Sequence, residues 1–201
     1  MQWITRSFCL CGWLMLATTG PVQAITIDLI PNYQELEVGT PLTVEIAISE
    51  LTGGAAPSLG VFDLDLVYDA TMLSFAGPDG VNFGNQLDLF DLGSVRAIED
   101  STPGVVNLFE LSLDLADDLD NLQLADFSLA TLTFDTLIEG MSTLALSINA
   151  LGDSIGAPLT AQVNGVEINI TASTQVPEPA PVLLLITSLA GLYWLRRKNP
   201  D

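Results

Sequence analysis

The feature that most constrains this chain is a two-residue alternation of apolar and polar side chains, repeated between residues 25 and 171. From Leu42 to Ile48, for example, every second residue is aliphatic, and the residues between are Thr, Glu and Ala. Successive side chains of a β-strand point to opposite faces, so this pattern predicts half-buried strands. Any fold of the chain must therefore pack the apolar faces of sheets against each other.

The alternation recurs in segments that are separated by turns rich in Gly, Asn, Asp and Pro. The expected strands cover residues 25–29, 42–48, 62–68, 73–76, 95–98, 105–113, 127–137, 144–148, 160–163 and 166–170. Short strands with turn signals between them are typical of sandwiches. We therefore predict an all-β domain, an antiparallel β-sandwich of jelly-roll type with about nine strands.

Local signals refine this prediction. Asn164-Gly165 is the clearest hairpin signal and predicts that the strands on either side pair with each other. The inward face of strand 127–137 changes at Leu129-Ala130, which predicts a β-bulge. Residues 31–39 are expected to be a plain connection, and residues 114–126 a loop or a single helical turn. Residues 77–93 are expected to be an irregular connection with short strands and five apolar anchors: Val81, Phe83, Leu87, Leu89 and Phe90.

Residues 1–24 have the features of a secretory signal peptide. Arg6 precedes an apolar run from Phe8 to Ala17, and small residues allow cleavage after Ala24. An N-terminal anchor helix is the alternative, but the run is short and a cleavage site follows it. Both cysteines of the chain lie in this run, so the exported protein has none.

Cleavage after Ala24 leaves a soluble part of residues 25–175, a single domain by length. Of the 25 acidic residues in the chain, only Glu178 and Asp201 lie outside this domain, and Arg96 is its only basic residue. The domain is therefore more acidic than the whole chain, whose net charge is −20. Such a surface repels nucleic acid and anionic membranes, while it suits solubility, divalent cations or a basic partner. Plain solubility outside the cell is the preferred interpretation.

The sequence lacks several residue types that enzymes use. It contains no histidine, no cysteine after Cys11 and no lysine before Lys198. The domain therefore has no His- or Cys-based triad, none of the usual zinc ligands and no Schiff-base lysine. No glycine-rich nucleotide-binding motif occurs. Only carboxylate chemistry remains, and we expect a non-catalytic protein.

Residues 176–201 form a separate unit. Pro177-Glu178-Pro179 is a stiff spacer, and residues 182–195 are uncharged and form the expected transmembrane helix. Counted from Ala180, the apolar segment has 16 residues, just under the about 17–25 of a usual span. Basic residues from Arg196 to Lys198 then mark the cytoplasmic side. An ordinary C-terminal membrane anchor is the plain interpretation.

This arrangement also resembles the PEP-CTERM sorting signal of Gram-negative bacteria, in which a Pro-Glu-Pro motif precedes a short hydrophobic helix and an arginine-rich end. The matching residues are Pro177, Glu178, Pro179, Arg196 and Arg197, together with helix 182–195. The resemblance implies recognition by an exosortase, a membrane transpeptidase-like enzyme, with cleavage near the motif. It also implies export and final location at the cell surface, the outer membrane or the extracellular matrix.

The order of the expected strands resembles the cohesin domain over most of residues 25–171. Three segments carry the likeness: Val38 to Val44, the strand and Tyr-Asp turn from Phe62 to Leu73, and Leu129 to Phe134. The resemblance implies a jelly-roll sandwich. Cohesins bind dockerin modules, and their fold relatives include carbohydrate-binding modules. The likeness assigns no contact residues in this sequence, so the ligand-binding residues stay unknown.

Two binding functions follow from this resemblance. The first is adhesion or scaffolding, with a dockerin-like or basic surface protein as the partner at a strand face. The alternative is a polysaccharide-binding module, although Trp3, Trp13 and Trp194 all lie in the targeting segments and leave only Tyr33 and Tyr68 in the domain. A glycosidase would need two particular carboxylates, and nothing in the sequence ranks the candidates.

A calcium site is the remaining possibility. Four aspartates lie close together in one segment, followed by Asn121: Asp114, Asp117, Asp118 and Asp120. Their oxygen atoms suit Ca²⁺, but the segment lacks the central Gly and the final Glu of an EF-hand loop. A solvated acidic loop is the preferred interpretation, and we expect no metal or other cofactor.

Overall fold

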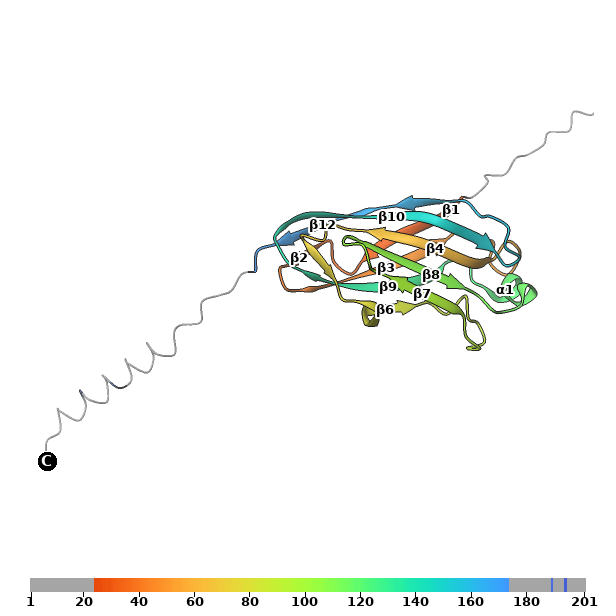
Figure 1. Cartoon of the computed structure of the whole chain (residues 1–201), viewed down its shortest axis with the longest axis horizontal. Helices are drawn as coiled ribbons and strands as arrows, with labels where there is room; N and C mark the ends of the chain where they lie inside the picture. The colour runs from red at the N-terminus through yellow and green to blue at the C-terminus, as the bar shows by residue number, and fades with distance from the viewer. Residues whose placement is uncertain (1–23, 174–188, 190–193, 195–201) are drawn as a thin grey trace, which may run out of the picture.

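The computed structural model describes residues 24–173 together with Leu189 and Trp194. Two β-sheets pack face to face in a sandwich (Figure 1). In spatial order, the first sheet contains β11 (Ala161–Asn164), β1 (Ile25–Pro31), β3 (Pro41–Ser49), β9 (Phe127–Thr136) and β5 (Leu73–Phe75), with β6 (Val81–Phe83) also paired with β9. The second sheet contains β2 (Glu35–Glu37), β12 (Val166–Thr171), β10 (Gly140–Asp153), β4 (Leu59–Val67), β8 (Val105–Leu111) and β7 (Val95–Glu99).

The predicted all-β sandwich is confirmed, with differences in its details. Each sheet has 6 strands, more in total than the nine or so expected. One of the additional strands is β2, which lies in the predicted connection 31–39 and runs parallel to β12. Its single buried residue is Leu36, so the strand is too short to show an alternation. A second parallel pair, β1 with β11, also departs from the antiparallel prediction.

The alternation places the core where it was expected. In β3 all four predicted inward residues are fully buried: Leu42, Val44, Ile46 and Ile48. In β4 the alternating apolar residues of the expected strand 62–68 are fully buried as well: Phe62, Leu64 and Leu66. Tyr68 follows β4 and packs its ring edge against Phe134, with 5.0 Å between the ring centroids. The inner faces of both sheets thus supply one continuous hydrophobic core.

The predicted bulge in β9 is confirmed. Ile46 of β3 lies opposite Ala130, but the next residue, Ala47, lies opposite Ser128, so Leu129 is the additional residue. Leu129 and Ala130 are both buried. Two consecutive residues can point inward only where the regular pleat is interrupted, which is the reason that the sequence signal was reliable.

The hairpin prediction at Asn164-Gly165 is wrong. The strands on either side belong to different sheets, since β11 pairs with β1 and β12 pairs with β10. Neither residue has the left-handed φ that a two-residue hairpin requires. A side chain at position 165 would instead lie 2.8 Å from the carbonyl oxygen of Leu144. The glycine is therefore needed for a close approach to β10, where the chain crosses between the sheets.

The longer connections partly match their predictions. Residues 77–93 contain the 3-10 turn η1 (Pro78–Gly80) and strand β6, and Leu87 is buried as an anchor. Phe90 is 49% exposed, so its prediction as an anchor is wrong. Segment 114–126 contains the short helix α1 (Ala116–Leu122), which buries only Leu119.

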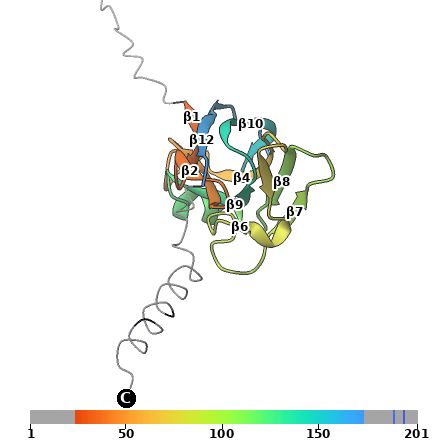
Figure 2. The same cartoon turned by 90° about the vertical axis from the view of Figure 1, so that its left-hand side faces the viewer.

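The strands run along the long axis of the domain. Figure 1 shows that β1 begins and β12 ends at opposite ends of the sandwich, with α1 at the end where β1 begins. The end view in Figure 2 shows the second sheet continuing from β10 through β4 and β8 to its edge at β7. Within the described part of the chain, no helix is long and apolar enough to span a membrane. The expected helix 182–195 lies outside the described residues except for Leu189 and Trp194.

We expect Leu64→Ala to lower the free energy of unfolding by about 2–5 kcal/mol, because it leaves a cavity between the two sheets. The exposed Met141→Ala serves as the control and should change stability by no more than about 0.5 kcal/mol. Urea unfolding of the full chain measures both. Equal, small effects of the two substitutions would show that residue 64 is not in a packed core.

Candidate functional site

The outer face of the second sheet gathers carboxylates on its central strand. Because Phe62, Leu64 and Leu66 point into the core, Asp63 and Asp65 must point outward from β4. Each has a neighbour on the same face of β8: Phe109 lies opposite Asp63, and Asn107 lies opposite Asp65.

The Asn107 side chain holds the two aspartates together. Its amide nitrogen donates to Oδ1 of Asp63 at 2.6 Å and to Oδ1 of Asp65 at 2.8 Å. A second amide, from Asn149 at the bulge in β10, donates to Asp63 Oδ1 at 3.2 Å. The Oδ2 atoms of both aspartates accept no hydrogen bond within the described residues. These two oxygens are therefore positioned and remain available to a partner.

The aspartates border a shallow depression of about 420 Å³. Seven residues line it: Asp63, Asp65, Glu99, Ser101, Thr102, Val105 and Asn107. Three of them are carboxylates and none is basic or aromatic. We refer to Asp63, Asp65, Glu99 and Asn107 as the aspartate face.

An apolar row lies beside the aspartate face on the same strands. Val61 of β4 lies opposite Leu111 of β8, which in turn lies opposite Val95 of β7. Leu111 and Val95 are exposed. A second depression, also of about 420 Å³, includes Val61, Ile148 and Leu159 in its lining. The outer face of this sheet thus combines apolar contact area with unneutralised negative charge.

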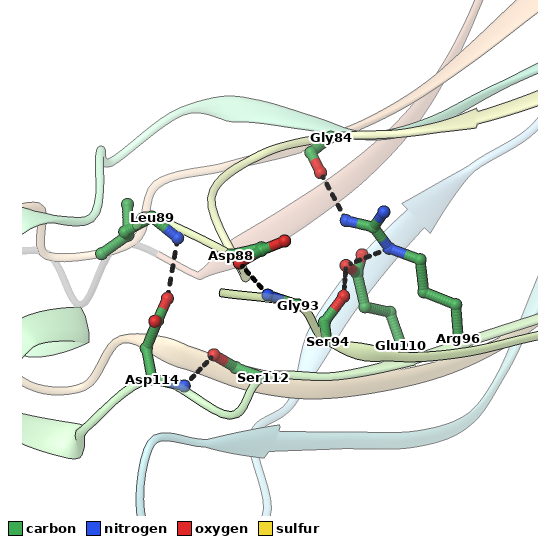
Figure 3. Close-up of polar contacts among 9 residues, drawn as sticks. All are labelled: Gly84, Asp88, Leu89, Gly93, Ser94, Arg96, Glu110, Ser112 and Asp114. Carbon is green, nitrogen blue, oxygen red and sulfur yellow. Dashed lines mark hydrogen bonds and ion pairs between the residues drawn. The ribbon is translucent and has the colours of Figure 1, made fainter. Parts of the chain in front are cut away.

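The one arginine of the domain is turned away from this face. Arg96 of β7 points inward, and its Nε donates to Oε1 of the fully buried Glu110 at 2.7 Å (Figure 3). The Ser94 hydroxyl donates to the same oxygen at 2.6 Å. The guanidinium also lies 5.2 Å from the centroid of the Phe83 ring, in the other sheet. Arg96 therefore links the sheet edges and does not neutralise the aspartate face.

We expect Arg96→Met to lower the free energy of unfolding by about 2 kcal/mol or more, because it leaves the Glu110 carboxylate buried without its cation. Adding Glu110→Leu should recover most of that loss, since the double variant buries no charge. Thermal and urea unfolding of both variants give the comparison. If the double variant is less stable than Arg96→Met alone, the ion pair does not have this role.

The four aspartates proposed from sequence as a weak calcium site take separate roles. Asp114, which precedes α1, accepts through Oδ2 from the backbone N–H of Leu89 at 2.7 Å. Asp120 Oδ1 accepts from the hydroxyls of Ser58, at 2.5 Å, and Ser154, at 3.0 Å. The hydrogen bond from Ser58 lowers the pKa of the Asp120 carboxyl. The remaining two, Asp117 and Asp118, lie in the first turn of the helix.

No group of three or more Asp, Glu, His or Cys residues in the described part of the chain is arranged to hold a metal ion. Asp114 and Asp120 instead stabilise loops through hydrogen bonds with Leu89, Ser58 and Ser154. The spacing of the aspartates in the sequence did not predict these partners. The sequence predicted only part of the aspartate face. The outward direction of Asp63 and Asp65 followed from the alternation, but the pairing that brings Asn107 beside them did not.

The other predicted site residues lie at the start of the described structure or outside it. Ala24 is exposed and directly precedes β1, so cleavage after it would leave the sandwich intact. The sorting motif lies outside the described residues: Pro177, Glu178, Pro179, Arg196 and Arg197. Both the signal cleavage and the sorting signal stay predictions.

Comparison with known proteins places the fold. No protein-family model matches this chain, and no curated protein matches it. Among solved structures, it is similar to the second type II cohesin module from the cellulosomal adaptor ScaA scaffoldin of Acetivibrio cellulolyticus, with a TM-score of 0.62 and 18% identity over 76% of this chain and 99% of that chain.

Two further structures show the same likeness. The sixth cohesin from scaffoldin B of Acetivibrio cellulolyticus, solved in complex with a Cel5 dockerin mutant, has a TM-score of 0.57 and 18% identity over 74% of this chain and 99% of that chain. A non-cellulosomal cohesin from the archaeon Archaeoglobus fulgidus has a TM-score of 0.56 and 16% identity over 76% and 94%. At such low identity the likeness concerns the fold alone: residues 25–171 form a β-sandwich with the fold of cohesin modules.

Proposed function

We propose that this protein is a non-catalytic, exported surface protein whose sandwich domain binds a protein partner through the aspartate face. The observation that carries the proposal is the pair of positioned, unpaired Oδ2 atoms of Asp63 and Asp65 beside an exposed apolar row. Exposed apolar area supplies contact energy in protein interfaces, while unneutralised charge supplies orientation and partner choice. The depressions on this face suit a partner that presents a cationic side chain next to an apolar one.

The chemistry of the face selects the class of partner. Because the domain has one arginine, and Arg96 is used internally, an acidic partner would be repelled by the whole surface. A basic partner would be attracted and correctly oriented. One of the similar cohesins was solved with a dockerin, which supports a dockerin-like module as the partner. The charge of the domain separately supports a basic surface protein.

Polysaccharide binding is the alternative for a sandwich of this kind. Sugar-binding faces use aromatic rings as stacking platforms, and neither depression on the outer face is lined by an aromatic residue. Tyr33 has an exposed ring, but it lies in the connection between β1 and β2, outside both depressions. The aspartate face therefore favours a protein partner.

We expect the immobilised full chain to retain its surface partner at 0.1 M salt and to release it toward 1 M, because the Debye length falls from about 10 Å to about 3 Å. Joint substitution Asp63→Asn and Asp65→Asn should weaken retention at least about tenfold. Glu45→Gln removes a charge from the outer face of the other sheet, and retention should hardly change.

Other outcomes of this experiment identify other ligands. Salt-insensitive retention of a neutral polysaccharide would overturn the protein-partner proposal in favour of carbohydrate binding. Retention that a chelator abolishes would indicate calcium bridging. Equal weakening by Glu45→Gln and by the aspartate pair would show that net charge, and not the aspartate face, governs binding.

The targeting segments supply the route to the surface in this proposal. Residues 1–24 would direct export of the domain and be cleaved off after Ala24. Residues 176–201 would then hold it in the membrane until an exosortase acts near Pro177-Glu178-Pro179. The protein would then reside at the cell surface, in the outer membrane or in the extracellular matrix. The alternative, a permanent membrane anchor, differs in leaving the tail uncut.

We expect the double substitution Pro177→Ala and Glu178→Ala to leave export intact but to block sorting, because neither residue is needed for membrane insertion. Fractionation and mass spectrometry of the C-terminus, in a strain that carries an exosortase, measure location and cleavage. Pro181→Ala, outside the motif, is the matched control. Normal processing and location of the double variant would contradict the sorting proposal.

A further inference from the structure

A second surface, at the end of the sandwich that contains α1, exposes many large apolar side chains. It consists of loop 84–94, residues 112–124 and the turn 153–157, and we call it the leucine end. Its exposed apolar side chains range from 49% accessible for Phe90 to 80% for Leu92: Phe90, Leu92, Leu113, Leu115, Leu122, Leu124 and Ile155. Gathered exposure of this kind is uncommon in soluble domains and usually marks a contact surface.

Loop 84–94 is fastened to the sandwich at several points. It begins at Gly84, which lies so close to the carbonyl oxygen of Ser128 that a side chain would collide with it. In the middle of the loop, the N–H of Leu89 donates to Asp114 Oδ2 at 2.7 Å (Figure 3). The loop is therefore held beside residues 112–115, and Phe90 and Leu92 are displayed by a fixed segment.

Helix α1 and the turn 153–157 are fastened in the same way. Asp120 accepts hydrogen bonds from both Ser58 and Ser154, which places Ile155 beside the helix. Just after the helix, Gln123 donates through its side-chain amide to the carbonyl of Leu59 at 2.9 Å. These bonds connect segments that are far apart in the sequence, so the tertiary structure holds the segments of the leucine end together.

The leucine end is uniformly acidic. Its three segments contain seven aspartates and no Lys or Arg: Asp88, Asp91, Asp114, Asp117, Asp118, Asp120 and Asp153. A second copy of the same surface would meet like charge, and so would an anionic membrane. A partner must therefore combine apolar side chains with positive charge.

We propose that the leucine end binds an amphipathic basic helix of a protein partner. Such a helix presents an apolar stripe flanked by Lys and Arg, which complements leucines interspersed with aspartates. The position of the surface favours this use, since it lies at the opposite end of the sandwich from the end of β12 (Figure 1). It would face away from a C-terminal anchor. The proposal does not depend on the aspartate face.

The test uses a short synthetic peptide of Leu and Lys, with leucines at helical spacing, titrated with the full chain by fluorescence anisotropy. We expect saturable binding that the double substitution Leu92→Ser and Leu115→Ser weakens at least about tenfold, because both side chains lose apolar contact. Both are largely exposed, so the fold should persist, and a thermal unfolding curve checks this. Met141→Ser, exposed at the opposite end, should bind like the parent.

Further arms decide the chemistry and the site. A peptide with scrambled leucines, or one with Glu in place of Lys, should bind at least about tenfold more weakly. Weakening by Asp63→Asn with Asp65→Asn, but not by the leucine pair, would overturn the proposal by moving the peptide to the aspartate face. Absence of peptide binding would overturn it too. So would self-association, or binding to phosphatidylcholine vesicles, that the leucine substitutions abolish.

Discussion

The structure depends on one constraint, the burial of every second residue along strands that face each other across two sheets. In β4 this constraint puts Phe62, Leu64 and Leu66 in the core and leaves no other direction for Asp63 and Asp65. Burial of apolar area is the main favourable term in folding, so the outward position of the carboxylates follows from the packing of the core. The hydrogen bonds from Asn107 and Asn149 then hold the Asp63 and Asp65 side chains in place on the sheet.

Charge is the second organising influence. A domain so rich in carboxylates could have exposed its one basic side chain to neutralise them, yet Arg96 points inward to Glu110 and Phe83. Arg96 thus connects β7 of the second sheet to β6 of the first. The aspartate face and the leucine end both stay acidic as a result. On the aspartate face, two neighbouring carboxylates lie beside a short row of exposed apolar side chains. The leucine end is mostly apolar, with aspartates between the exposed leucines. Two chemically different surfaces could serve two partners at once.

The sequence predicted what depends on local periodicity and missed what depends on pairing. The inward residues of β3 and β4 and the bulge at Leu129 could be read directly from the alternation. The pairing of β12, which follows Asn164, could not be predicted, because a turn signal does not show which sheet the next strand joins. Asn107 was equally hidden, since its role depends on which residues β8 places beside β4. The roles of Asp114 and Asp120 required contacts with residues far away in the sequence.

Whether the outer face of β4 and β8 is a recognition surface is tested most directly by carboxyl footprinting. The full chain would be labelled with a carbodiimide and an amine, with and without its bound partner, and the modified residues identified by mass spectrometry. We expect partner binding to protect Asp63 and Asp65 from labelling, while Asp28 and Glu45, on the outer face of the other sheet, stay equally reactive. Unchanged labelling of Asp63 and Asp65, with protection of Asp28 and Glu45, would contradict this expectation.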